Sequence, residues 1–230
     1  MSEAPAQAYR MTDAVRDRVL RRQGRLHAHD SIKASRSALV VVDMQNYFCA
    51  PGFPAEVPAS RATVPAINRM ASALRMQGGA VVWVQTSARH ALNRWGQHHR
   101  HMLTEARVQS RLAGLAEDAR GFQLFDGLQA DPSDLFVPKV MYSAFVEGSS
   151  DLHRILRSRG IESLLVAGTA TNVCCESTAR DAMMLDYRVI MLSDANSAFT
   201  LEEHVSSLDN FALFFGDVMS VDDACARLTS

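Results

Sequence analysis

The sequence has few cysteines, and their spacing excludes a disulfide-stapled fold. The chain of 230 residues contains four, at Cys49, Cys174, Cys175 and Cys225. None of them forms a C-x-x-C pair, and a secreted disulfide framework would need a different pattern. This cysteine usage fits a reducing compartment, where a thiol serves either packing or reactivity.

The sequence also lacks an excess of charge and a long apolar run. Its 24 basic and 25 acidic residues give a formal net charge of -1, so no overall field attracts nucleic acid or an anionic membrane. No apolar stretch approaches the ~20 residues that span a bilayer. The start, Met1 to Ala6, lacks the basic-then-apolar pattern of a signal peptide. We therefore expect a cytoplasmic protein whose partner is a small molecule, with no nucleic-acid or membrane partner.

Hydrophobic residues are abundant, at 47% of the chain, which is enough for one sizeable core. Residues 1–36 are expected to form an N-terminal arm, with the basic stretch Arg16 to Arg25 on a short helix. This helix is expected to pack on its own domain or on a neighbouring subunit, with nucleic-acid binding as the alternative. Residues 37–230 are expected to form one domain, since no repeat, linker or low-complexity tract divides them.

Within that domain, apolar β-branched runs alternate with stretches whose apolar residues recur at helical spacing. The strand–helix–strand order predicts right-handed parallel crossovers and an α/β fold with a mostly parallel sheet. Strands are predicted at 38–43, 80–86, 134–139, 164–169, 188–195 and 218–221, and helices at 64–75, 151–160, 174–185, 200–214 and 221–228.

Residues 87–127 have a weaker pattern and are expected to be a less regular surface or lid segment. His98, His99 and His101 invite a metal interpretation, but no Cys, Asp or Glu lies among them, so no metal site is predicted there. Arg94 or Trp95 in the same segment could contact a substrate, although a solvated loop is the favoured alternative.

The stretch from Leu164 to Ala182 is the most informative part of the chain. A buried strand runs into small residues and then into a helix whose first turn contains Cys174. A helix N-terminus at the carboxyl edge of a sheet favours thiolate over thiol, so this position is expected to activate a cysteine. Taken alone, the alternative that Cys174 is a small packing residue is favoured.

Asp43, Lys139 and Cys174 each follow or end a different predicted strand, so parallel neighbouring strands would bring them into one pocket. Cys174 would then be the nucleophile, Asp43 the base that takes its proton, and Lys139 a cation that stabilises both charges. The electrophile would be a carbonyl, because the backbone N–H groups of Ala170 and Cys174 could form an oxyanion hole.

Three motifs in this order closely resemble the isochorismatase-like cysteine hydrolase superfamily, over roughly residues 36–225. They are Val40-Val41-Val42-Asp43-Met44-Gln45-Asn46, then Pro138-Lys139, then Gly168-Thr169-Ala170-Thr171-Asn172-Val173-Cys174-Cys175-Glu176-Ser177-Thr178. The resemblance implies a three-layer α/β/α sandwich and a catalytic triad of Asp43, Lys139 and Cys174. It also implies a cis peptide between Thr169 and Ala170, a homo-oligomer (dimer or tetramer) and no organic cofactor.

Within the superfamily, Cys174 favours the amidohydrolase branch, whose members cleave C–N bonds of amides and ureido compounds. The segments are most similar to ureidoacrylate amidohydrolases and N-carbamoylsarcosine amidases, while the stretch Arg94 to His101 and the arm before Ser37 match less well. Nicotinamidases carry metal-binding histidines after the first strand, and Tyr47 to Ser60 contains none, so no catalytic metal is expected. An isochorismatase or nicotinamidase type remains the alternative within the family.

Gln85, Tyr142 and Asn172 are predicted to bind substrate. Gln85 ends a strand on the active edge, although a turn or cap role is equally compatible; Tyr142 follows Lys139 but could be a core residue. For Asn172 we favour a structural role, in which its side chain fixes the backbone of the corner. Two other classes of function stay open: a non-catalytic interaction module on the same fold, and a thiol redox protein that uses Cys174 and Cys175.

Overall fold

The computed structural model describes residues 6–230. Residues 1–5, which belong to the expected N-terminal arm and to the stretch without a signal-peptide pattern, lie outside the described residues. Its centre is a six-stranded sheet with the order β4-β3-β2-β5-β6-β7, and each pairing is parallel. The strands are β2 (Ser37–Val42), β3 (Ala80–Thr86), β4 (Leu135–Lys139), β5 (Ser163–Thr169), β6 (Arg188–Ser197) and β7 (Asp217–Met219).

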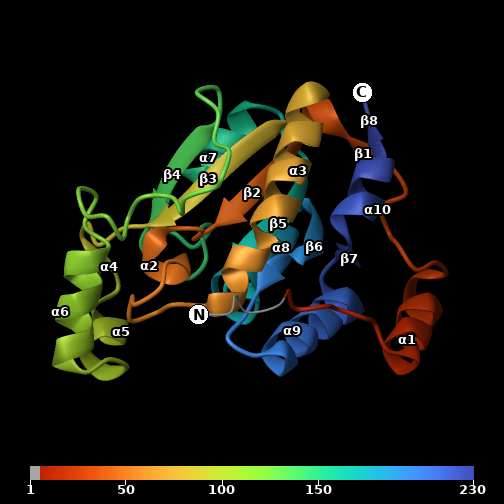
Figure 1. Cartoon of the computed structure of the whole chain (residues 1–230). Helices are drawn as coiled ribbons and strands as arrows, with labels where there is room; N and C mark the ends of the chain where they lie inside the picture. The colour runs from red at the N-terminus through yellow and green to blue at the C-terminus, as the bar shows by residue number, and fades with distance from the viewer. Residues whose placement is uncertain (1–5) are drawn as a thin grey trace.

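Helices cover both faces of the sheet (Figure 1). One hydrophobic core contains residues from α1, α7, α8 and α9, and the other contains residues from α3 and α10. The expected α/β fold with helices on both sides is therefore confirmed. The helices are α1 (Asp13–Gln23), α2 (Asn46–Cys49), α3 (Val64–Met76), α4 (Ala91–Arg94), α5 (Gly96–His101), α6 (Glu105–Gly114), α7 (Leu152–Ser158), α8 (Glu176–Met184), α9 (Leu201–Phe214) and α10 (Val221–Ala226).

Short elements complete the chain. Two 3-10 turns, η1 (Ala34–Arg36) and η2 (Pro58–Thr63), precede β2 and α3, and a π-helical turn, η3 (Thr171–Cys175), precedes α8. A separate two-stranded sheet pairs β1 (Ile32–Lys33) with β8 (Leu228–Thr229) near the chain's end. In residues 6–230, no helix is long and apolar enough to cross a membrane.

The strand order has a switch point between β2 and β5. The chain builds β2, β3 and β4 toward one edge of the sheet, and then β5, β6 and β7 toward the other. At such a point the loops that leave adjacent strands diverge, and the crevice between them is where open α/β sheets bind ligands. Asp43 follows β2 and the Cys174 turn follows β5, so both flank this crevice.

The N-terminal arm packs on the rest of the chain in the part that the structure describes. The Tyr9 hydroxyl donates to Asp209 Oδ1 at 2.8 Å, and Val19 of α1 is 2% exposed within the core beneath α9. This contact fits the expectation that the basic helix packs on its own domain. The boundary at residue 37 stays a prediction.

The segment 87–127 differs from the expected irregular loop, because it contains α4, α5 and α6. The sequence signal that was missed is at α6, where the Thr104 hydroxyl accepts from the N–H of Arg107 and Glu105 lies in the first turn. No residue of α6 is buried. The helix is held by this cap and by contacts at its end.

Gly168 of β5 approaches the end of β2 more closely than any side chain would permit. Its φ is +123°, and a Cβ atom on it would lie 2.0 Å from the Val42 carbonyl oxygen and 2.7 Å from the Val42 nitrogen. Both obstacles are backbone atoms of the next strand, which cannot move without disturbing the pairing. The lack of a side chain at Gly168 thus allows the close approach of two neighbouring strand ends, the end of β2 that precedes Asp43 and the end of β5 that precedes the Cys174 turn.

We predict that Gly168→Ala lowers the free energy of unfolding by at least about 2 kcal/mol, through overpacking and the unfavourable φ together. Gly78→Ala is the matched control, because Gly78 also has a positive φ (+79°) but nothing within 4 Å of its Cβ position. Urea unfolding of both variants measures the difference. Equal losses would show that the close contact with Val42 contributes nothing beyond the backbone conformation.

Candidate active site

Asp43 and Lys139 form a buried ion pair. Lys139 Nζ lies 2.8 Å from Asp43 Oδ2, and both side chains are 0% exposed. The ammonium also donates to Thr86 Oγ1 at 2.7 Å and to the Met141 carbonyl at 3.1 Å. All three ammonium protons thus have acceptors, which is the condition under which a buried charge is tolerated.

Thr86 joins the two charges and was not among the residues singled out in the sequence. Its hydroxyl donates to Asp43 Oδ1 at 2.8 Å, and its N–H donates to the same oxygen at 3.1 Å. In the β3–β4 register Thr86 lies opposite Lys139. Neighbouring side chains in a strand point to opposite faces, so this register brings Thr86, and not Gln85, to the pair.

The backbone directs Asp43 toward its partners. Asp43 has a φ of +55°, and its N–H donates to the Val84 carbonyl at 2.8 Å. Gln45 then holds the end of β3, since its Oε1 accepts from the Thr86 N–H at 2.7 Å and its Nε2 donates to the Thr86 carbonyl at 3.1 Å. The carboxylate is thereby fixed by two neighbouring strands.

Cys174 completes the group from the π-helical turn after β5, and its residue is 8% exposed. Burial raises the pKa of the Cys174 thiol to about 12; the negative charge of Asp43 adds to this rise, while the positive charge of Lys139 opposes it. The expectation that this corner favours a resting thiolate is therefore wrong. Desolvation and the adjacent carboxylate outweigh the cation, and the resting group is a protonated thiol beside Asp43.

The pKa of Lys139 is raised in spite of its burial. Burial by itself would lower the pKa, but the charge of Asp43 and the hydrogen bond to Asp43 outweigh it. The Lys139 side chain is therefore charged at neutral pH. Asp43, Lys139 and Cys174, which were predicted from the ends of three strands, thus lie in one cluster.

Cys175 faces elsewhere. It is 0% exposed, and its sulfur lies 4.0 Å from the Ala167 carbonyl oxygen in the core. All four cysteines are free thiols. Of the adjacent pair, Cys174 is 8% exposed and Cys175 is not exposed at all, so the structure distinguishes the two.

The peptide between Thr169 and Ala170 is cis, as the resemblance implied. Ala170 is 9% exposed and directly precedes the Cys174 turn. Within the described residues, its N–H donates to no backbone carbonyl, whereas its carbonyl accepts from Val173 and Cys175 at 3.1 and 3.2 Å. The corner thus leaves an N–H group without a backbone partner beside the thiol.

Two side chains of α9 support this corner from beneath. The fully buried His204 contacts Thr171 Oγ1 through Nδ1 at 2.8 Å and the Ser193 carbonyl through Nε2 at 3.2 Å. Since the carbonyl can only accept, Nε2 carries the proton and Nδ1 accepts from the Thr171 hydroxyl. Ser207 donates to Glu176 Oε2 at 2.6 Å. These contacts fix the turn relative to α9.

The three predicted substrate-binding residues lie in different surroundings. Gln85 is 7% exposed and donates to the Phe122 carbonyl at 2.9 Å, which is a structural contact. The Asn172 Oδ1 atom is buried without a partner, and Asn172 lines a separate cavity with residues of α8 and α9. Tyr142 is 37% exposed, and burial of the rest of the side chain raises its pKa.

Tyr142 belongs to an aromatic cluster with the segment that precedes α6. Its ring packs edge-on against Trp95 at 4.7 Å and against His98 at 5.4 Å, and Trp95 stacks on His98 at 3.9 Å. The histidine-containing stretch thus contributes an aromatic wall. No group of three or more potential metal ligands occurs in residues 6–230.

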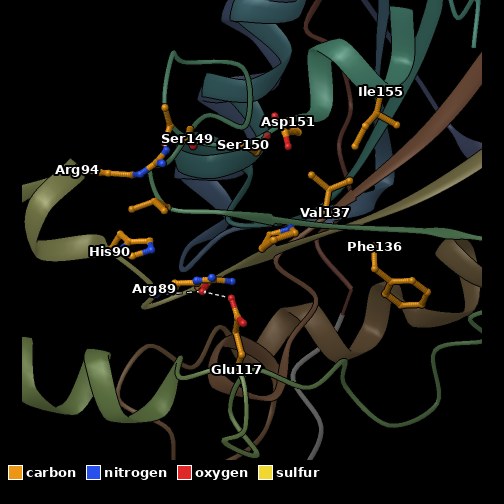
Figure 2. Close-up of a pocket in the computed structure, with 14 residues that line it drawn as sticks. Arg89, His90, Arg94, Glu117, Phe136, Val137, Ser149, Ser150, Asp151 and Ile155 are labelled. Carbon is orange, nitrogen blue, oxygen red and sulfur yellow. Dashed lines mark hydrogen bonds between the residues drawn. The ribbon is translucent and has the colours of Figure 1, made fainter. Parts of the chain in front are cut away.

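A cavity of about 590 Å³ lies beside the edge strand β4. Figure 2 shows Arg89, Arg94 and Glu117 around it, with Arg94 reaching toward the loop of Ser149. Ser87, Pro138 and Val140 also line it, whereas Asp43, Lys139 and Cys174 do not. This cavity therefore lies outside the buried cluster.

The chain is similar to known hydrolases over most of its length. A family model described as isochorismatase domain matches residues 37–223. The ureidoacrylate amidohydrolase RutB of Pseudomonas syringae pv. syringae (strain B728a) is 38% identical over 214 residues, which are 86% of each chain. Among solved structures, a cysteine hydrolase from Pseudomonas syringae pv. phaseolicola 1448A has a TM-score of 0.73 at 28% identity, covering 85% of this chain and 93% of that one. N-carbamoylsarcosine amidase from Thermoplasma acidophilum has a TM-score of 0.62 at 26% identity, covering 81% and 97%.

We predict a loss of stability in mild acid through His204. Burial lowers the pKa of His204 from 6.5 to about 4. The neutral ring is favoured in the folded state, so its full contribution is present above pH 6.5 and is lost as the pH falls toward 4, by roughly 3 kcal/mol.

The matched variant is His204→Gln, which can keep both hydrogen bonds without titrating. Urea unfolding between pH 7 and about 4 should show a steeper loss for the wild type than for this variant, because the effects of carboxylates are common to both. Parallel curves would contradict the assignment of the acid sensitivity to His204.

Proposed function

The chain belongs to the isochorismatase family of hydrolases, and from this premise we propose that it is a cysteine-dependent amidohydrolase. It would cleave a C–N bond of a small ureido, carbamoyl or primary amide compound through a thioester. The observation that carries the proposal is the fully buried Asp43–Lys139 pair, 2.8 Å apart, whose charges both act on the pKa of the Cys174 thiol.

In the first half-reaction, Cys174 sulfur attacks the carbonyl carbon while its proton passes to the Asp43 carboxylate. The raised pKa of Cys174, caused by burial and by Asp43, makes this transfer concurrent with attack instead of preceding it. Lys139 stays charged and balances the negative charge that moves from carboxylate to substrate oxygen. The N–H groups of Ala170 and Cys174 would bind that oxygen in the tetrahedral intermediate.

The intermediate collapses when the C–N bond breaks and protonated Asp43 gives its proton to the leaving nitrogen. Ammonia or an amine departs, and the acyl group remains on Cys174 as a thioester. Asp43, again a carboxylate, then takes a proton from water as that water attacks the thioester carbonyl. Collapse of the second intermediate releases the acid product and returns the proton to Cys174 sulfur, so each group ends as it began.

The names of two similar proteins specify a ureido and an N-carbamoyl compound, and this supports the same substrate class here. A non-catalytic module would have no use for a desolvated ion pair beside a thiol, because such a pair contributes little to stability. A Cys174–Cys175 redox couple is disfavoured, since the Cys175 sulfur faces the core. Action without an organic cofactor or a metal, and as a homo-oligomer, stays part of the proposal.

We predict that Cys174→Ala abolishes ammonia release in a screen of ureido acids, carbamoyl amino acids, biuret and simple primary amides, without unfolding the protein. The control is Cys175→Ala, which removes the neighbouring buried thiol and should retain turnover. Unchanged hydrolysis by Cys174→Ala would remove the proposal. An equal loss in both variants, with native unfolding curves, would mean that the nucleophile is misassigned.

We also predict that Thr86→Val lowers kcat by roughly 10- to 100-fold, because a hydroxyl between two buried charges is lost and Lys139 keeps an unused donor. Thr86→Ser, which keeps the hydroxyl, should restore most of the rate. Steady-state kinetics on the best substrate of the screen tests this. Equal activity of the Val and Ser variants would show that the hydroxyl has no part in catalysis.

A further inference from the structure

The N-terminal arm lies before the residues that the family model matches, and the mechanism above gives it no role. In its first described part, residues 6–12, exposed and half-buried residues alternate, which is typical of an extended chain. The half-buried residues are Gln7, Tyr9 and Met11. Tyr9 and Met11 pack against the hydrophobic core that contains Cys174. The arm therefore covers the face of the sheet that also carries the proposed nucleophile.

The side chain of Gln7 takes the place of a neighbouring strand at the end of β6. Its Oε1 accepts from the Ala198 N–H at 2.8 Å, and its Nε2 donates to the Ala198 carbonyl at 3.1 Å. β7 pairs with β6 only as far as Leu192, so the end of β6 extends beyond its neighbour in the sheet. Because a side-chain amide has the same donor and acceptor as a peptide group, Gln7 supplies the pairing that β7 does not.

The end of β6 borders the corner that contains the cis peptide. Thr169 of β5 lies opposite Ser197 in the register, and its hydroxyl donates to the Ser197 carbonyl at 3.2 Å. The register between β5 and β6 shifts just before this point, so the strand end is not the continuation of a regular ladder. Gln7 binds Ala198, the residue after Ser197, and thereby fixes the strand end that Thr169 contacts.

The arm also holds α9, which is the second support of the corner. The Tyr9 hydroxyl donates to Asp209 Oδ1 at 2.8 Å, and Arg22 of α1 donates to two carbonyls in the last turn of α9. Figure 1 shows the arm running past α9 to α1. His204 of the same helix binds the first residue of the Cys174 turn. Both supports of the nucleophile corner are thus held by one segment.

We propose that the N-terminal arm is a positioning element of the active site and that Gln7 is its principal contact. This inference rests on the proposed function. Among residues 6–230, the side chains of Gln7 and Tyr9 bind Ala198 and Asp209, so they act on the reaction only through β6 and α9. Catalysis is sensitive to such contacts, because a displacement of about 1 Å at the reacting groups can lower a rate by about 100-fold.

Gln7→Ala should lower kcat by roughly 10-fold and leave KM within about twofold, because the arm positions the corner and does not bind substrate. Arg25→Gln is the matched control within the arm, since this guanidinium binds Asp30 at 2.7 Å and the Ala28 carbonyl at 3.0 Å. Ser220→Ala is the control for stability: it removes the N-cap of α10, which packs in the other core. It should lower the urea midpoint without lowering kcat.

Gln7→Glu provides a readout that a general loss of stability would not reproduce. An ionised carboxyl group at this position accepts from the Ala198 N–H but cannot donate to the Ala198 carbonyl, whereas a protonated one does both. The kcat of this variant relative to wild type should therefore rise as the pH falls from about 8 to about 5, while the ratio for Gln7→Ala stays constant. A constant ratio for Gln7→Glu, or a wild-type kcat for Gln7→Ala, would overturn the inference.

Hydrogen exchange measured by mass spectrometry tests the same contact without turnover. Gln7→Ala should speed exchange by about 10-fold or more in residues 169–176 and in α9, and leave β3 unchanged, because local opening depends on local contacts. Unchanged exchange in residues 169–176 would contradict a positioning role. Turnover by Cys174→Ala would refute the proposed function instead, and the exchange rates would still decide whether the arm fixes the corner.

Discussion

The ion pair between Asp43 and Lys139 is the constraint to which the surrounding structure is adapted. Both side chains are fully buried. Without a partner, each charge would cost on the order of several kcal/mol to remove from water. The pair persists because every ammonium proton has an acceptor and both carboxylate oxygens have donors. These partners come from the ends of β2, β3 and β4, so the sheet itself has to be in register for the charges to be tolerated.

The same requirement explains the features next to the pair. Gly168 allows β5 to approach the end of β2, where a side chain would collide with Val42. Beneath the corner, His204 holds Thr171 and Ser207 holds Glu176. The crevice at the switch point between β2 and β5 is therefore narrow and rigid, and this is the condition for a thiol, a carboxylate and backbone N–H groups to act on one carbonyl.

The strand ends and the helical segment α4 to α6 differ in the roles proposed for them. Asp43, Lys139 and the Cys174 turn are anchored by strands, whereas α4, α5 and α6 lie beyond the strand ends and α6 buries nothing. The strands carry the groups proposed for the bond chemistry, and the helical segment contributes Trp95 and His98, which pack against Tyr142.

The sequence by itself determined the succession of strands and helices along the chain and the residues at the strand ends. The reason is that buried parallel strands have continuous apolar sequences that stop at polar residues. Asp43, Lys139 and Cys174 could be selected on that basis, and the family resemblance added the cis peptide. Only the tertiary structure decided the spatial order of the strands in the sheet, the hydrogen bond of Thr86 with Lys139, and the protonated state of Cys174. Each depends on register and burial across segments distant in sequence: the β3–β4 register selects Thr86 over Gln85, and desolvation outweighs the Lys139 charge at the thiol. The position of α6 belongs to the same group, because its end is fixed by a contact with a segment distant in sequence, between the Leu115 carbonyl and the Ala88 N–H.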